Sequence, residues 1–425
     1  MRRAGLYTAG AMAAALLLAA AVWWLNLRDE PDLRAPAAEV PTTPDLVARG
    51  AYLALAGNCA SCHTSRGGAA YAGGRGIDTP FGTVYTSNLT PDADTGLGRW
   101  SPAEFWRAMH NGRSKDGRLL YPAFPYTSYT EVSRADSDAL YAYLKSLPPT
   151  PQAATPHALR WPFNLQPALA VWRALYFRPG TPPVDASQSA EWNRGAYLVR
   201  GLGHCGACHT ARNALGATDD RLNLAGGMIP MQNWYAPSLT SPQEAGVADW
   251  PREDIVHLLQ TGVAPGGSVL GPMAEVVLKS TQHLSTEDLG AMATYLKALP
   301  QAAEPAARPA VDRKVAERGS RLYERHCAQC HGDQGQGVRA AYPPLAGNRA
   351  VTMPQVANLV QAVLNGGYAP ATAGNPRPFG MPPFVLVLDD ADIAAVLTHI
   401  RSAWGSQAGG VTEIEVNRLR AGQGR

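Results

Sequence analysis

Six cysteines and three histidines share one spacing that occurs three times along the chain. The motif Cys-x-x-Cys-His begins at positions 59, 205 and 327. One helical turn with this spacing presents two thiols and an imidazole to a single macrocycle, which is the attachment pattern of a c-type haem. We therefore predict three covalently bound haem c groups, each with an iron. The thiols would come from Cys59, Cys62, Cys205, Cys208, Cys327 and Cys330, and the proximal iron ligands would be His63, His209 and His331.

The other chemistries of paired cysteines fit this chain less well. C-x-x-C also occurs in zinc sites and in thioredoxin-like redox pairs. A zinc site would need two such pairs close together, whereas here the pairs lie far apart along the chain. All six cysteines fall inside the motifs, so that none remains for a disulfide.

Length and composition agree with several small domains. The chain has 425 residues, for which the expectation is about three domains. Its residues are 46% hydrophobic and 17% charged, with a net charge of +3. This near balance of charge argues against a nucleic-acid partner. A large apolar prosthetic group would supply core to short, loop-rich domains.

The N-terminal segment indicates where the protein works. Arg2 and Arg3 precede a stretch from Leu6 to Leu27 without any charged residue, and Trp23 and Trp24 lie near its end. This length can cross a bilayer, and tryptophans favour the membrane interface. A cleaved signal peptide with small residues at 19–21 is the alternative. We favour a retained helix that anchors the chain to the periplasmic face of the bacterial inner membrane.

Short repeated signatures flank each motif. An Arg-Gly pair precedes every motif, at 49–50, 194–195 and 318–319, and a helix is expected after each one, over 136–147, 286–299 and 389–404. Apolar residues recur there with helical spacing, and proline follows the first two helices. No segment alternates like a strand. The predicted fold class is all-α, with three tandem cytochrome c-like domains after the N-terminal helix.

The repeats suggest domain boundaries. The expected order is an anchor or signal peptide (1–28), a linker (29–44), domain 1 (45–150), a proline-rich linker (151–188), domain 2 (189–300), a linker (301–312), domain 3 (313–405) and a polar tail (406–425). The proline-rich linker contains an apolar stretch from Leu165 to Phe177. This stretch is interpreted either as a helix that packs the first domain on the second or as a docking patch for a partner or the membrane.

The sixth iron ligands are expected to differ between the domains. Methionine on a late loop usually fills this position in small cytochromes c. Met273 and Met381 lie on such loops in domains 2 and 3. Aligning Trp100 with Trp250 instead brings Phe124 to within one position of Met273. Phenylalanine cannot bind iron, so we hypothesise a five-coordinate or weakly ligated first haem.

Several longer strings resemble the triheme cytochrome c subunit of membrane-bound bacterial alcohol, gluconate, sorbitol and aldehyde dehydrogenases. They are Thr-Pro-Phe-Gly-Thr-Val-Tyr at 79–85, Asn-Leu-Thr-Pro-Asp at 88–92, Gly-Pro-Met-Ala-Glu-Val-Val at 271–277 and Phe-Gly-Met-Pro-Pro-Phe at 379–384. The resemblance implies an electron-transfer subunit with no catalytic residues of its own. It would pass electrons from a large catalytic subunit of flavin, quinone-cofactor or molybdopterin type through its haems to membrane ubiquinone. Pro-Ala-Phe-Pro-Tyr at 122–126 also resembles cytochrome subunits that serve molybdenum enzymes.

Two other functions are weighed against this one. The N-terminal anchor would suit a cytochrome subunit of a terminal oxidase, although the three-domain pattern does not. An open first haem could make the chain a haem reductase or peroxidase. Such enzymes usually place a polar residue beside the bound ligand, and Phe124 offers none.

Overall fold

The computed structural model describes residues 2–30, 33, 40–219, 222–302, 311–339 and 341–422. Most of the predicted linker at 301–312, and much of that at 29–44, lies outside these residues. Helices dominate, as predicted, but the all-α expectation is only partly correct. Within the described ranges, short strands form one three-stranded and three two-stranded sheets. These strands have two to four residues, too few to produce a visible alternation in the sequence.

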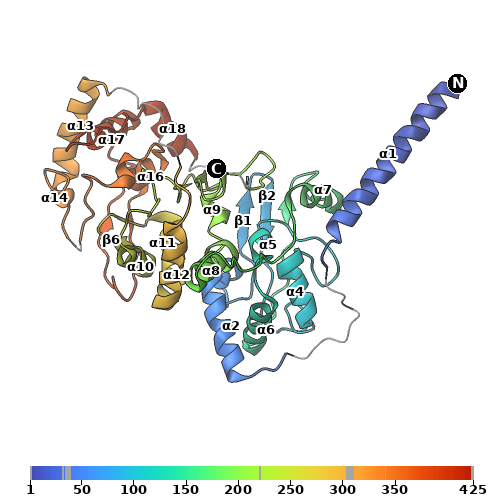
Figure 1. The fold of residues 1–425 in the computed structure, drawn as a ribbon. Coiled ribbons are helices and arrows are strands. Elements are labelled where there is room, and N and C mark those ends of the chain that lie inside the picture. The colour runs from blue at the N-terminus through green and yellow to red at the C-terminus, as the bar shows by residue number, and fades with distance from the viewer. Residues whose placement is uncertain are drawn as a thin grey trace. The chain divides into compact units, whose positions relative to one another are not determined.

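The chain divides into two compact units. The first contains residues 1–184 with the segments 200–204 and 214–217, and the second contains 185–199, 205–213 and 218–425. The helices of the first unit are α1 (Arg2–Asn26), α2 (Pro44–Ala56), α3 (Cys59–His63), α4 (Pro102–Asn111), α5 (Tyr126–Tyr129), α6 (Arg134–Ser146) and α7 (Gln166–Tyr176) (Figure 1). Its antiparallel sheet has the order β1 (Gly76–Thr79), β2 (Gly82–Tyr85), β3 (Ala158–Leu159), with Gly76 opposite Tyr85 and Gly82 opposite Leu159.

The second unit holds the remaining elements. Its helices are α8 (Ala190–Ala196), α9 (Gly206–His209), α10 (Arg252–Thr261), α11 (Gly271–Lys279), α12 (Thr286–Lys297), α13 (Arg313–His326), α14 (Ala328–His331), α15 (Arg349–Thr352), α16 (Ala357–Asn365), α17 (Asp390–Ser402) and α18 (Glu413–Ala421). A π-helix (Tyr197–Leu202) follows α8 and has its last three residues, 200–202, in the first unit, and a 3-10 turn (Thr281–His283) follows α11. Antiparallel pairs join β4 (Gly227–Met228) to β5 (Tyr235–Ala236), β6 (Val263–Ala264) to β7 (Gly267–Ser268), and β8 (Gly367–Tyr368) to β9 (Gly380–Met381).

One helix crossing occurs three times, and the Arg-Gly pair forms its centre. The helix with Arg-Gly packs on the later helix in the pairs α2 with α6, α8 with α12, and α13 with α17. A methyl group added at Gly50 would overlap the carbonyl oxygen of Ala139. The same overlap, with the carbonyls of Ala291 and Ala395, would occur at the glycines of the other two pairs, 195 and 319. Glycine is therefore required because the two backbones touch there.

The arginine of each pair binds the facing helix. Arg194 donates to both carboxylate oxygens of Asp288, at 2.7 Å each. Asp288 is the third residue of α12, and its backbone N–H donates to the N-cap hydroxyl of Ser285 at 3.1 Å. The other two crossings repeat the arrangement, with Arg49 on Asp136 and Arg318 on Asp392. Each aspartate thus joins a helix start to the crossing helix, where its negative charge is also favoured.

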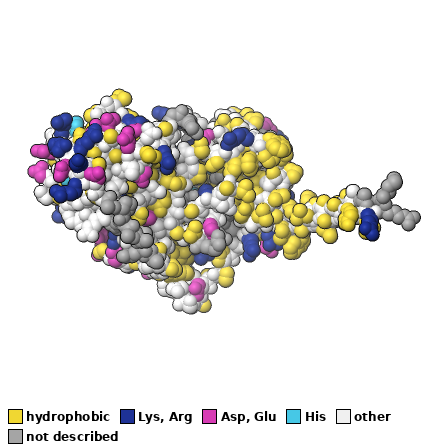
Figure 2. Space-filling view, turned by 90° about the horizontal axis from the view of Figure 1, so that it is seen from above, with side chains coloured by type: hydrophobic (Ala, Val, Ile, Leu, Met, Phe, Trp, Pro, Cys, Tyr) yellow, Lys and Arg dark blue, Asp and Glu magenta, His cyan; other side chains and the backbone are white. Residues whose placement is uncertain are grey.

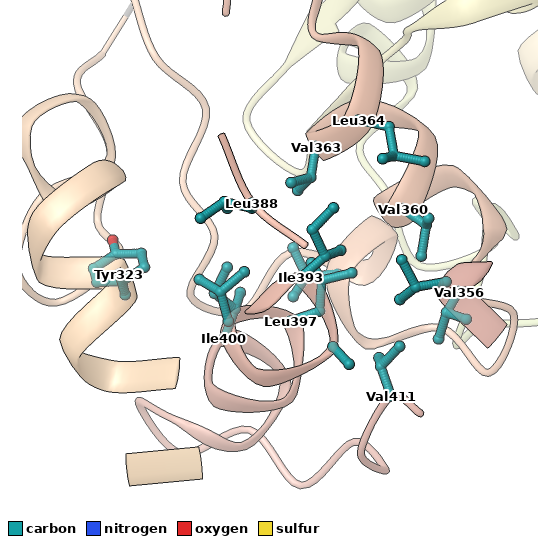
Figure 3. Close-up of a cluster of buried hydrophobic side chains, with 14 residues drawn as sticks. Tyr323, Val356, Val360, Val363, Leu364, Leu388, Ile393, Leu397, Ile400 and Val411 are labelled. Atoms are coloured by element: carbon teal, nitrogen blue, oxygen red, sulfur yellow. The ribbon is translucent and has the colours of Figure 1, made fainter. Parts of the chain in front are cut away.

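A buried apolar cluster of the second unit lies where α13, α16 and α17 meet (Figure 3). Ile393 and Leu397 of α17 are at its centre with Val360 and Leu364 of α16, all at most 1% exposed. The sequence from 406 onwards, expected to be a polar tail, contributes to this core. Its helix α18 packs on α17 and buries Val416 completely.

Candidate haem sites

The three Cys-x-x-Cys-His motifs have the same local geometry. Each lies on a helix of about one turn, α3, α9 or α14. In the second motif, the backbone N–H of His209 donates to the carbonyl of Cys205 at 2.9 Å, and His331 makes the same bond to Cys327. A single turn therefore brings the histidine and both cysteines of a motif together, as the spacing predicts.

The three motif histidines are oriented by backbone carbonyls. The Nδ1 atom of His63 lies 2.8 Å from the carbonyl oxygen of Ser87. For His209 and His331 the acceptors are the carbonyls of Pro237 at 2.7 Å and Pro343 at 3.0 Å. A carbonyl can only accept, so Nδ1 carries the proton and Nε2 keeps the lone pair that a metal requires. Sequence reasoning missed these acceptors, because nothing marks a backbone carbonyl in a sequence.

Burial keeps the three motif histidines and the first cysteine of each motif in their neutral forms. Burial lowers the pKa of His63, His209 and His331, so that the imidazoles are neutral near pH 7. Burial, followed by the neighbouring thiol, raises the pKa of Cys59 and Cys205 to about 12. All six thiols are free of disulfides. This set of neutral imidazoles and thiols outside any disulfide fits a covalently attached haem.

The two predicted methionine ligands, Met273 and Met381, lie in different surroundings. Met381 is partly buried and packs on the same apolar cluster as Cys327 and Ala328. Met381 and the start of the third motif thus border one apolar cluster, and the role of Met381 as iron ligand stays an expectation. Met273 was expected on a loop, but it lies in the first turn of α11, where it is partly buried, because the helix already begins at Gly271. Its role as iron ligand remains an expectation.

Two arginines contact the motifs in a way that the sequence did not reveal. Arg75 donates to the carbonyl oxygen of Ser61, and Arg212 donates to that of Ala207 at 2.8 Å. Each acceptor is the residue before the second cysteine of its motif. Arg75 lies in a glycine-rich loop just before β1. In the structure this loop returns a positive charge to the first motif.

Known proteins share these features. The family model described as Cytochrome c matches residues 47–148 and 316–404. A nicotinate dehydrogenase subunit of Pseudomonas putida is 43% identical over 88% of this chain, which spans only 32% of that relative. The cytochrome c subunit of the alcohol dehydrogenase (quinone) of Gluconacetobacter polyoxogenes is 38% identical over 89% of this chain and 86% of its own length. The gluconate 2-dehydrogenase cytochrome c subunit of Pantoea cypripedii is 38% identical over 88% of this chain and 89% of its own length.

The helix crossings, the motif geometry and the family match define a c-type cytochrome. Within this class the similarity extends over nearly the whole length of particular relatives. The chain belongs to the family of cytochrome c subunits of bacterial dehydrogenases.

Proposed function

We propose that this chain is a triheme electron-transfer subunit that carries electrons from a dehydrogenase catalytic subunit to membrane ubiquinone. The observation that carries the proposal is the threefold recurrence of one site. In each copy, a one-turn helix presents two thiols and a histidine whose Nδ1 is held by a carbonyl. Haem c supplies one-electron storage at each copy when bound.

The haem count rests on the middle copy, because the family model matches only the stretches around the first and third motifs. The second copy has an arginine–aspartate bond, between Arg194 and Asp288, and a helix crossing at a glycine, Gly195. Both features have equivalents in the other two copies. Lys297 donates to the carbonyl of Ala248 at 3.0 Å, as Lys145 donates to that of Gly98 at 2.7 Å. We therefore assign three cytochrome c domains to the chain.

The chain's own residues position and tune the haems. The carbonyls of Ser87, Pro237 and Pro343 hold the proximal histidines, and Met273 and Met381 are assigned as sixth ligands of the second and third irons. Methionine ligation raises a reduction potential, and burial adjusts it further. Attachment to one chain keeps electron transfer between the haems intramolecular, so that it needs no diffusional encounter.

The relatives suggest the class of partner. Their names refer to alcohol, gluconate and nicotinate as dehydrogenase substrates, and one name includes a quinone. We propose a large catalytic subunit of flavin, quinone-cofactor or molybdopterin type. The Pro-Ala-Phe-Pro-Tyr string around Phe124, which resembles cytochrome subunits that serve molybdenum enzymes, favours the molybdopterin type.

We also propose that α1 is retained as a membrane anchor on the periplasmic face. The apolar part of this helix, Leu6–Asn26, has 21 residues, of which only the last, Asn26, is buried. This is longer than the apolar part of a signal peptide and long enough to span a bilayer. The side-chain amide of Asn26 donates to the carbonyl of Ala170 at 2.9 Å, which attaches the end of α1 to α7.

Purification of the tagged chain from membranes in mild detergent tests the proposal. We expect three haems per chain by pyridine haemochrome assay, an intact mass that includes α1, and a co-purifying dehydrogenase subunit with its cofactor. The substrate of that subunit should reduce the haems, and a ubiquinone analogue should reoxidise them. Fewer than three haems, or co-purification with oxidase subunits in place of a dehydrogenase, would contradict it.

A further inference from the structure

We propose that no side chain of this protein binds the sixth position of the iron held by His63, so that this iron can bind a small neutral ligand such as carbon monoxide. The inference rests on the proposed function in one respect, namely that each motif carries a haem. It concerns the first unit, and its evidence comes from comparing the segments after α4 and α10, which begin with the same glycine cap and the same backbone hydrogen bond.

The segments after α4 and α10 begin with the same glycine cap and with one equivalent backbone hydrogen bond. Both helices end on a glycine in the left-handed conformation, Gly112 with φ 58° and Gly262 with φ 81°. The backbone N–H of Leu120 donates to the carbonyl of Gly112 at 2.8 Å, and that of Val269 donates to Gly262 at 2.9 Å. These two bonds fix the alignment of the loops without reference to side chains.

This alignment places Phe124 at the position of Met273. Phe124 is the fourth residue after Leu120, and Met273 is the fourth residue after Val269. The sequence had suggested this equivalence only to within one position. A methionine sulfur can donate a lone pair to iron, whereas a phenyl ring has none to donate. The residue that would bind the iron in domain 2 is therefore replaced in domain 1 by one that cannot bind it.

Contacts of Phe124 connect it to the first motif. Its ring centroid lies 5.4 Å from that of Tyr129. The hydroxyl of Tyr129 donates to the carbonyl of Gly57 at 3.1 Å, two residues before Cys59. Tyr129 is 6% exposed. Phe124 thus belongs to an aromatic layer that reaches the start of the first haem motif.

Two other possible ligands on α4 are used in packing. Met109 is three residues before Gly112, where α10 has Leu259, and these side chains are 6% and 8% exposed. The match indicates a core position. The ring of His110 stacks on Trp106 with centroids 4.4 Å apart and is 7% exposed.

Two further histidines of the first unit are engaged by other groups. The Nδ1 atom of His157 accepts from the backbone N–H of Tyr85 at 3.1 Å, so its Nε2 carries the proton in the neutral ring. His204 donates from Nδ1 to the carbonyl of Leu202 at 2.9 Å, and its ring packs on Tyr129 with centroids 5.5 Å apart. His204 is the side chain to examine should the sixth position prove to be filled.

A titration of the reduced holoprotein with carbon monoxide tests the proposal. We expect the visible spectrum of one of the three haems to shift in the wild-type chain. The variant Phe124→Met should lose this shift, because a sixth ligand is restored at the aligned position. The matched variant Met273→Phe should show the shift for two haems. The covalent haem content and far-UV circular dichroism of each sample establish that it is folded and loaded.

The outcomes separate this inference from the proposed function. A wild-type protein with three haems and no carbon monoxide shift would overturn the open position while leaving the electron-transfer role intact. If the variant His204→Gln then gained a carbon monoxide shift, His204 would be identified as the sixth ligand of the first iron. A shift that persists unchanged in a loaded Phe124→Met chain would refute the assigned position. A chain with fewer than three haems would instead contradict the proposed function.

A different observation supports a second inference, that the outward face of α7 lies on the lipid surface beside α1. In this helix the charged side chain faces inward and apolar side chains face outward, the opposite of a helix on a water-exposed surface. Its one charged residue, Arg173, is 3% exposed. The guanidinium donates to the carbonyl of Asn111 at 2.7 Å and to Oδ1 of Asn26 at 2.9 Å. The outward side chains Val171 and Leu175 are apolar and 48% and 66% exposed.

The position of this face identifies lipid as its occupant. Hydrophobic side chains gather on the part of the first unit from which α1 emerges (Figure 2). The apolar surface continues into the segment before α7, where Trp161 is 77% exposed. Arg160 and Arg178 lie just beyond the two ends. An apolar face flanked by cations and attached to the end of a membrane span is typical of an interfacial helix.

Hydroxyl-radical footprinting of the full chain in phospholipid nanodiscs tests this surface. The inference rests on retention of α1, which holds the chain in the disc. Trp161 and Tyr176 should be oxidised several-fold more slowly than Tyr368, which is 68% exposed in the second unit and serves as the matched control. Oxidation of Trp161 at the rate of Tyr368 would refute lipid contact. Protection that arises only after the catalytic subunit is added would assign this face to a protein partner instead.

Discussion

Nδ1 of His209 lies 2.7 Å from the carbonyl oxygen of Pro237, a residue far from the motif in the sequence. The same relationship recurs at the other two motifs, although the carbonyl belongs to serine in one case and to proline in the others. Because a backbone carbonyl makes the contact, the residue that supplies this carbonyl can differ in its side chain from one motif to the next. What recurs is the path of the chain, which returns to cover the histidine. Each motif therefore has its own histidine acceptor and can be altered separately.

The first prediction concerns the haem stoichiometry. Replacing Cys205 and Cys208 together by serine should remove one haem and leave the other two attached, because each motif has its own histidine acceptor. Intact mass spectrometry should show a loss equal to one haem, and peptide mapping should locate the loss at the altered motif. The corresponding double variant at Cys327 and Cys330 provides the matched comparison. Loss of all haem from either chain would contradict independent sites.

The second prediction concerns the helix crossing at Gly319. Gly319→Ala should destabilise the second unit by about 1–3 kcal/mol, the usual cost of overpacking, because the added methyl group would overlap the carbonyl of Ala395. Thermal unfolding followed by circular dichroism measures the change. Gly267→Ala is the matched control, since nothing lies within 4 Å of the added carbon. Equal effects of the two substitutions would argue against close backbone contact at the crossing.

The third prediction concerns the bond between Arg194 and Asp288. Asp288 is 9% exposed, and Arg194→Ala would remove both hydrogen bonds that its carboxylate accepts from the guanidinium. We expect a loss of roughly 1–2 kcal/mol, the lower part of the range for hydrogen bonds to charged groups, because the arginine is partly exposed. A double-mutant cycle with Asp288→Asn should give a coupling of similar size. Additive effects in the cycle would contradict a direct interaction.

The fourth prediction concerns pH and α18. Burial of Asp390 would raise the pKa of its carboxyl, but hydrogen bonds from Asn417 and Arg420 hold this pKa below its usual range. The folded state therefore binds fewer protons than the unfolded state near the ordinary pKa of aspartate. Stability from this group is present above about pH 4 and is lost as the pH falls through the lowered value.

Hydrogen exchange of α18 measures this effect. Protection of the helix should decrease on acidification in the wild type. In Asp390→Asn the protection should be lower at neutral pH and should change less with acid. An unchanged pH dependence in the variant would show that another group is responsible.

Local patterns were sufficient to predict much of this protein. The spacing of the three motifs predicted a one-turn helix at each motif, and the helical periodicity located α6, α12 and α17 to within a few residues. These features depend on neighbours along the chain, so the sequence contains their full description. The apolar stretch before position 177 likewise predicted a helix, which is α7.

The tertiary structure decided what depends on residues far apart in the chain. Only folding brings the carbonyl of Pro237 to His209, or Asp288 to Arg194, because no local signal specifies either partner. The short strands were missed since their pairing is a property of two segments and not of one. The inward direction of Arg173 and the placement of Phe124 at the position of Met273 are also results of packing and backbone hydrogen bonds. The sequence by itself determined which groups could carry haem, and the fold decided how each one is held.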